Sequence, residues 1–182
     1  MIKKILVGLA ALAAILLIVA AVKSPDFRVE RSRTIAAPPA AIFEQLNDHR
    51  KFNAWNPFLK MDPNAKVTYS GPEAGVGAVS EWDGAKVGAG KATITDSTPN
   101  QLVRERMDWL RPMEGTSTVE FTIVPDGERQ RVTWAMHGRS NFTGRLISVF
   151  MNCDTMCGPP FEQGLADLEK IVTSTTPAPA KP

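Results

Sequence analysis

The chain has 182 residues, of which 43% are apolar and 22% charged, and its formal net charge at pH 7 is +2. This is the composition of an ordinary globular protein. The small charge and the scattered basic residues give no reason to expect binding to nucleic acid. Once both ends are set aside, about 145 residues remain, which corresponds to one domain with one hydrophobic core.

Residues 1–23 are predicted to form a transmembrane helix. An uninterrupted apolar run of 18 residues, 5–22, follows Lys3 and Lys4, and as a helix it is about 27 Å long, just enough to cross a bilayer. A signal peptide is the alternative, because the run ends in small residues that suit cleavage. The apolar run is longer than in most cleaved signals, which favours a retained anchor.

The flanking charges predict the orientation of this helix. Lys3 and Lys4 favour a cytoplasmic N-terminus, which places the domain on the outer side of the membrane. Basic residues also follow the apolar run, at Lys23 and Arg28 among others, and they weaken this prediction.

The segment 27–58 predicts a strand followed by short helices. In the strand 27–36, Phe27, Val29 and Ile35 share one face while polar residues take the other. Two prolines then end the strand and favour a helix start. The helix predicted for 39–48 is amphipathic but too short to be stable alone, so it must pack on a larger element.

Six further strands are predicted in quick succession. Their ranges are 66–70, 77–82, 86–96, 101–110, 114–124 and 131–138. The links between them are short and rich in Gly, Pro, Asn and Asp, which favours antiparallel neighbours. Because no link is long enough for a crossover helix, a parallel nucleotide-binding sheet is excluded.

A long amphipathic helix is predicted from residue 141 to residue 173, with apolar residues three and four apart. The sequence Gly158-Pro159-Pro160 interrupts it, which predicts a kink or a division into two helices. Residues 174–182 are rich in Pro and Ala and are expected to form a disordered tail.

Several motifs resemble those of one family. They are Ala37-Pro38-Pro39-Ala40-Ala41-Ile42-Phe43 before Trp55-Asn56-Pro57, then Tyr69-Ser70-Gly71-Pro72, Gly75-Val76-Gly77, Thr133-Trp134-Ala135-Met136 and Phe150-Met151-Asn152. Together with the element order, they resemble the START-like (SRPBCC) superfamily, in particular bacterial proteins of the polyketide cyclase/dehydrase-like subgroup. The resemblance covers residues 27 to about 172.

The resemblance implies an α+β helix-grip fold for residues 24–173. In this fold a curved antiparallel sheet of about seven strands wraps around a long C-terminal helix, here expected to be kinked, and leaves a ligand cavity between them. The superfamily shares a cavity rather than a catalytic motif, so the function must be argued from the site.

Strand and helix periodicity selects the residues that can line this cavity. The predicted ligand-binding residues are Trp55, Phe58, Trp82, Glu105, Met107, Trp109, Phe121, Trp134, Met136, Phe150, Cys153 and Met156. Such a lining suits an apolar or aromatic ligand, and methionine lets a pocket adapt its shape. The alternative is a filled core without a ligand.

Glu105 breaks the apolar pattern because it falls on the inward face of its strand. A buried carboxylate without partners is costly, so its pKa would rise or it would recruit a donor. We interpret Glu105 as a weak catalytic candidate or a ligand-orienting group. The alternative is that a bulge turns it outward or that it pairs at the rim.

Other catalytic groups are few. Tyr69, Asp154 and His137 are the remaining acid–base candidates, but His137 has outward parity. His49 is expected to be solvated, since it lies beside Arg50 and Lys51.

The cysteine and histidine side chains of the chain indicate neither a metal site nor a cofactor. Cys153 and Cys157 are four residues apart on a helix, a spacing that strains a disulfide, so free buried thiols are expected. With only two histidines in the chain, neither a metal site nor a cofactor is predicted.

The sequence therefore favours a membrane-anchored START-like domain that binds a hydrophobic small molecule or lipid without turnover. The first alternative is a polyketide cyclase- or dehydratase-like enzyme that uses Glu105 as a base. The second is a non-catalytic interaction module at the membrane surface.

Overall fold

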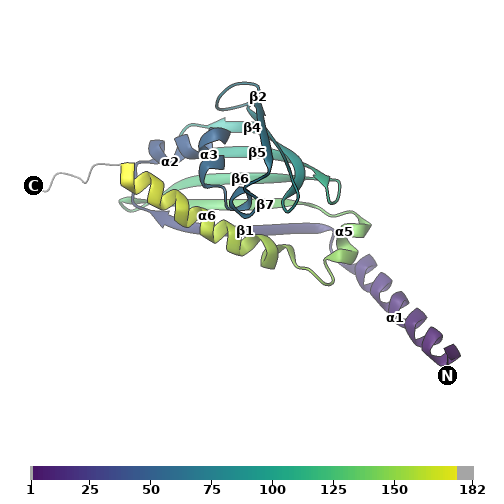
Figure 1. Ribbon diagram of the computed structural model, residues 1–182. Helices are drawn as coiled ribbons and strands as arrows, with labels where there is room; N and C mark the ends of the chain where they lie inside the picture. Colours follow the sequence, from purple (N-terminus) through teal and green to yellow (C-terminus); the bar gives the residue numbers. More distant parts are fainter. Residues whose placement is uncertain (1, 176–182) are drawn as a thin grey trace, which may run out of the picture.

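A seven-stranded antiparallel sheet forms the centre of the computed structural model, which describes residues 2–175 (Figure 1). The strands are β1 (Asp26–Ile35), β2 (Lys66–Ser70), β3 (Val79–Gly84), β4 (Gly88–Thr98), β5 (Leu102–Arg111), β6 (Gly115–Asp126) and β7 (Arg129–Arg139). The prediction of seven strands is confirmed, and the predicted bounds lie within two residues of these.

The strand order is β1-β7-β6-β5-β4-β3-β2. Strands β2 to β7 follow one another as antiparallel neighbours because the links between them are short. The first strand then pairs with the last, from Asp26 opposite Arg139 to Ile35 opposite Gln130. This order leaves β1 and β2 at the two edges of the sheet.

Three short helices connect β1 to β2: α2 (Pro39–Leu46), α3 (His49–Trp55) and α4 (Pro57–Met61). Each begins at a local signal. Pro39 opens α2, the Asp48 carboxylate accepts the N–H of Arg50 at 2.8 Å to cap α3, and the Asn56 side chain accepts the N–H of Phe58 at 3.0 Å to cap α4.

The C-terminal helix departs from the prediction. Instead of one element from 141 to 173, the structure has α5 (Phe142–Ile147) and α6 (Cys153–Thr175), with the break at residues 148–152. The Asn152 side chain accepts the N–H of Asp154 at 3.0 Å and so caps the start of α6. The apolar spacing continues across this point and therefore did not indicate that a new helix begins there. Helix α6 continues through Pro159 and Pro160, so a division into two helices there is wrong, and the kink stays a prediction.

The inner face of the sheet holds the core. Helix α6 packs mainly along β1, and α2 contacts β5 and β6 (Figure 1). Val29, Ile35, Val103, Val119 and Ile123 are buried there, as their strand parity predicts. Residues 176–182, most of the predicted tail, lie outside the described residues.

Helix α1 (Ile2–Val22) extends away from the sheet (Figure 1). It is long and apolar enough to cross a membrane, and nearly all of it is exposed. A signal sequence meets the same criteria of length and composition.

Candidate functional site

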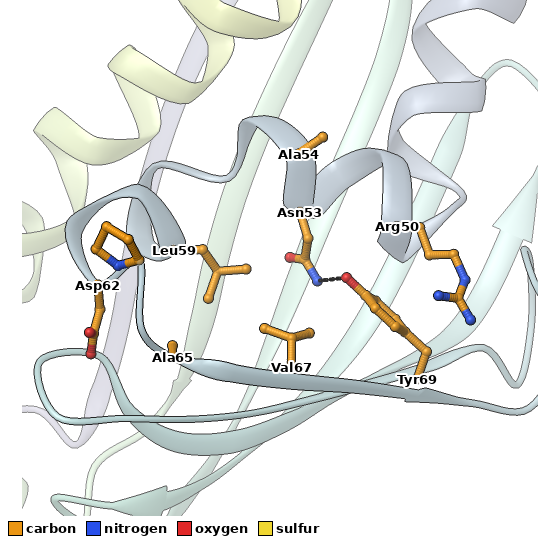
Figure 2. Close-up of a pocket in the computed structure, with 9 residues that line it drawn as sticks. Arg50, Asn53, Ala54, Leu59, Asp62, Ala65, Val67 and Tyr69 are labelled. Atoms are coloured by element: carbon orange, nitrogen blue, oxygen red, sulfur yellow. Dashed lines mark hydrogen bonds between the residues drawn. The ribbon is translucent and has the colours of Figure 1, made fainter.

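A pocket of about 340 Å³ lies between helices α3 and α4 and the edge strand β2 (Figure 2). Val67 and Tyr69 of β2 lie opposite Trp82 and Ser80 of β3, so they face the inner side of the sheet. The full lining is Arg50, Asn53, Ala54, Leu59, Asp62, Pro63, Ala65, Val67 and Tyr69. The pocket is therefore part of the interior of the grip, at its open edge.

Side-chain contacts organise the polar end of this pocket. The Asn53 amide donates to the Tyr69 hydroxyl at 3.2 Å (Figure 2). It also donates to the Ser80 hydroxyl at 3.0 Å, so Asn53 joins α3 to β2 and β3. The Arg50 guanidinium lies over the Tyr69 ring at 4.4 Å from its centroid. Among the described residues, no carboxylate forms an ion pair with Arg50, so its charge is open to a ligand.

The opposite end of the pocket is structural. The buried Asp62 carboxylate accepts the N–H groups of Lys86 and Val87, at 2.7 and 3.3 Å, and so holds the turn between β3 and β4. Between the two ends, Leu59 and Val67 supply apolar surface (Figure 2). The arrangement suits an amphipathic molecule, with apolar contacts in the middle and hydrogen-bonding groups near Arg50.

The space under α6 is filled by aromatic rings. Trp134 stacks on Phe161 of α6 with 4.2 Å between ring centroids, and its ring centroid is 5.0 Å from that of Phe121. Phe52 and Trp55 of α3 close the cluster, with 4.7 Å between their centroids. These rings occupy the place where the sequence predicted a ligand cavity, because they pack against one another in stacked, tilted and edge-to-face contacts.

A buried pair of titratable groups lies next to this cluster. Glu105 is 3% exposed and points inward, as predicted; the alternative in which a bulge turns it outward is wrong. The register shift nearest to Glu105 lies on the neighbouring strand β4, between Ile94 and Asp96. His49 was predicted to be solvated, but it is 3% exposed, because the first residue of α3 faces the sheet.

Geometry and burial indicate the protonation of this pair. His49 Nε2 is 3.3 Å from the carbonyl of Ala78, and Nδ1 is 3.6 Å from Glu105 Oε1, an atom without a hydrogen-bond partner. Desolvation raises the pKa of Glu105 to about 8 and lowers the pKa of His49. At neutral pH the favoured state is a protonated carboxyl beside a neutral imidazole.

A second, smaller cavity of about 50 Å³ reaches His49 from the surface. Arg50 and Tyr69 line both cavities. These two side chains therefore separate the larger pocket from the smaller cavity that contains His49.

The structure divides the predicted ligand-binding residues into three groups. Trp55, Glu105, Phe121, Trp134 and Met136 are buried, and Phe58, Trp82, Met107, Trp109 and Cys153 are partly buried. Phe150 and Met156, predicted to line the cavity, are instead 72% and 53% exposed. Phe150 falls in the break between α5 and α6. Met156 lies five residues before the buried Phe161 on the same helix, about 140° around its axis, and so faces outward.

The lining of the larger pocket was not predicted, except that Tyr69 had been named as an acid–base candidate. The alternation of β2 places Val67 and Tyr69 on one face, so the signal for them was present in the sequence. Arg50 and Asn53 belong to a helix of seven residues, too short for periodicity to indicate which face is buried.

The other acid–base candidates, His137 and Asp154, line neither of the two cavities described above. His137 lies on the outer face as predicted, with Nε2 3.8 Å from Glu120 Oε2. Asp154 forms an ion pair with Arg31 at 2.7 Å, and this guanidinium lowers the pKa of Asp154. Cys153 and Cys157 are free thiols, partly rather than fully buried.

Residues 2–175 contain no group of three or more His, Cys, Asp or Glu placed to hold a metal ion.

The sequence from residue 26 to residue 172 matches a family model described as polyketide cyclase / dehydrase and lipid transport. The chain belongs to this family. The match covers every strand of the sheet and nearly all of α6. In a comparison with curated proteins, no sequence match was found.

Solved structures of this fold family share the architecture at low sequence identity. A protein from Mesorhizobium loti is 15% identical with a TM-score of 0.60, over 83% of this chain and 100% of its own. A protein from Chromobacterium violaceum is 16% identical with a TM-score of 0.59, over 80% and 96%. The major latex-like protein 151 of Panax ginseng is 12% identical with a TM-score of 0.56, over 81% and 98%. At these identities the likeness establishes the fold, which is the predicted helix-grip fold.

Proposed function

We propose that this protein is a membrane-tethered binding protein for a hydrophobic small molecule or lipid. The observation that carries the proposal is the pocket of about 340 Å³ between α3, α4 and β2, whose size is within the range of small-molecule sites. The family description, which includes lipid transport, supports an apolar ligand. Because the space under α6 is filled, we place the ligand at the edge of the sheet.

The lining restricts the chemistry of the ligand. Leu59 and Val67 contact its apolar part, and the Tyr69 hydroxyl, which the Asn53 amide holds in place, offers a hydrogen bond to a polar group. Arg50, which has no carboxylate partner among the described residues, favours a ligand with an electronegative or anionic end.

Ligand binding in this pocket can be tested on the full chain. The protein is extracted with its surrounding lipid in nanodiscs, and bound small molecules are identified by mass spectrometry. The variant Val67→Trp fills the pocket from the inner face of β2 and should reduce the bound ligand about tenfold, a loss near 1.4 kcal/mol. Thr68→Trp is the matched control, because Thr68 is exposed on the outer face of the same strand. Equal ligand content in both variants would exclude this pocket.

The tether is tested separately. The full chain should stay in the membrane fraction after a high-salt wash, since an apolar span does not depend on screened charges. A soluble product that begins near residue 22 would instead establish cleavage of a signal peptide. We place the domain on the outer side of the membrane, and protease protection in oriented vesicles checks this.

The second candidate function is a cyclase- or dehydratase-like enzyme, and the buried pair of Glu105 and His49 favours it. A carboxyl with a pKa of about 8 is mostly protonated at neutral pH, so it can donate a proton, and its small ionised fraction can accept one. Neither cavity includes Glu105 in its lining, which favours binding over turnover.

The enzyme hypothesis predicts that Glu105→Gln abolishes turnover of a polyketide-type substrate in the full chain while ligand binding is kept. Unchanged turnover would exclude Glu105 as the acid–base group.

A further inference from the structure

Apolar side chains are exposed along the stretch of chain that joins β7 to α6. We call residues 142–156 the α5 segment. Its exposed side chains are Phe142 (44%), Ile147 (37%), Phe150 (72%), Met151 (49%) and Met156 (53%). From residue 142 to residue 152 the segment carries one charged side chain, Arg145, and no carboxylate. A surface of this kind marks a site of contact with a partner or a membrane.

The α5 segment is bound directly to the end of helix α1. The Arg145 guanidinium donates to the carbonyl of Ala21 at 3.1 Å, and the Lys23 ammonium donates to the carbonyl of Ser148. Ala20 is fully buried although nearly all of α1 is exposed, and α1 and α5 pack against each other (Figure 1). The two basic side chains therefore join the last turn of α1 to α5.

The link from α1 to the sheet is too short to separate them. Only three residues lie between the end of α1 at Val22 and the start of β1 at Asp26, which span at most about 10 Å. Within this link, the Pro25 carbonyl accepts the N–H of Ser140 at 2.8 Å, just before α5 begins. If α1 crosses the bilayer, the α5 segment lies at the level of the lipid headgroups.

We propose that the α5 segment is a second membrane contact, which inserts its exposed Phe, Ile and Met side chains into the interface of the bilayer that α1 crosses. This proposal rests on the membrane tether proposed above. Apolar side chains gain stability at the boundary of headgroups and acyl chains, and Lys23 and Arg145 lie where they meet acidic headgroups. Two points of attachment hold the domain in one orientation on the membrane.

Photo-crosslinking to lipid tests this contact in the full chain. The protein is reconstituted in vesicles of phosphatidylcholine and phosphatidylglycerol that contain a diazirine-labelled acyl chain, and tryptic peptides are mapped by mass spectrometry after illumination. We expect label on peptide 5–23, which covers α1, and on peptide 146–170, which covers most of the α5 segment. Peptide 34–50, from the opposite end of the strands, should carry none.

The double variant Phe150→Glu, Met151→Glu should lower the label on peptide 146–170 at least about fivefold, equivalent to about 1 kcal/mol, and leave peptide 5–23 unchanged. Both side chains are exposed, so the fold should tolerate the change. Val124→Glu is the control, because Val124 is also exposed, at 54%, but lies at the far end of β6.

The outcomes separate this proposal from the tether. Label on peptide 5–23 without label on peptide 146–170 would overturn the α5 contact and leave the tether intact. Absence of label from both peptides would overturn the tether and, with it, this proposal.

Discussion

The inner face of the sheet has two halves that differ in packing. Under α6, Trp134, Phe121 and Phe161 interlock, and their side chains are at most 3% exposed. Under α3 and α4, the short strand β2 faces a pocket in which Arg50, Asn53 and Tyr69 remain reachable. Both halves have inward-facing residues of correct parity, so parity alone does not indicate where a ligand fits. Whether a half is filled or open depends on the length of the helix that covers it, α6 or the short α3 and α4, and on the size of the side chains on that helix.

This comparison predicts different costs for removing an aromatic ring from the two halves. Trp134→Ala should lower the free energy of unfolding by about 3–5 kcal/mol, because it leaves a cavity among rings that cannot collapse. Tyr69→Ala should cost about 1 kcal/mol, since it removes a hydrogen bond from Asn53 and a contact with Arg50 at a half-open site. Chemical denaturation of both variants measures the difference, and equal costs would mean that the two halves are equally well packed.

The buried carboxyl at the border of the two halves predicts a pH dependence. The pKa of Glu105 is about 8 in the folded state against an ordinary value of 4.5. Between pH 4.5 and about pH 8 the Glu105 carboxyl is ionised in the unfolded chain but still protonated in the folded protein. The free energy of unfolding therefore falls as the pH rises through this range. Above the folded pKa this loss is complete.

Glu105→Gln does not titrate and should therefore be more stable than the wild type at pH 8, by an amount on the order of a few kcal/mol. The difference should shrink towards about pH 5. His49, whose pKa is lowered by burial, is present in both proteins and does not affect the comparison directly. A difference in unfolding free energy that is the same at both pH values would contradict the assignment of a neutral, buried carboxyl.

A further prediction, smaller than those for Trp134 and Glu105, concerns the contact between α6 and the sheet. A Cβ on Gly164 would come within 2.7 Å of the Trp134 ring. Gly164→Ala should therefore destabilise the protein by about 1–2 kcal/mol, although alanine favours a helix over glycine. Gly115→Ala is the control, since a Cβ there meets no atom within 4 Å. A thermal unfolding series of both variants measures the effect, and a stabilised Gly164→Ala would mean that the packing under α6 is looser than described.

Much of the fold could be predicted from the sequence because the signals are local. Alternation gave the strands, and Pro39 marked the start of α2. The single C-terminal helix was predicted wrongly at residues 148–152, because apolar spacing continues across a break that the Asn152 side chain creates.

Less of the candidate site could be predicted. Glu105 was identified because a charged residue on an inward face is unusual, but its partner His49 was missed, since neighbouring Arg50 and Lys51 indicate a solvated segment. A helix turns each successive side chain by about 100°, so these neighbours say little about which way His49 points.

The sequence by itself determined the antiparallel sheet, the order of the strands along the chain, the apolar N-terminal helix and the inward parity of Glu105. These follow from side-chain periodicity and turn chemistry, which act over a few residues. Only the tertiary structure decided which part of the interior is filled, that His49 is buried against Glu105, and that the α5 segment lies at the end of α1. Each of these depends on how rings and short helices from distant parts of the chain pack together, and no local pattern encodes that packing.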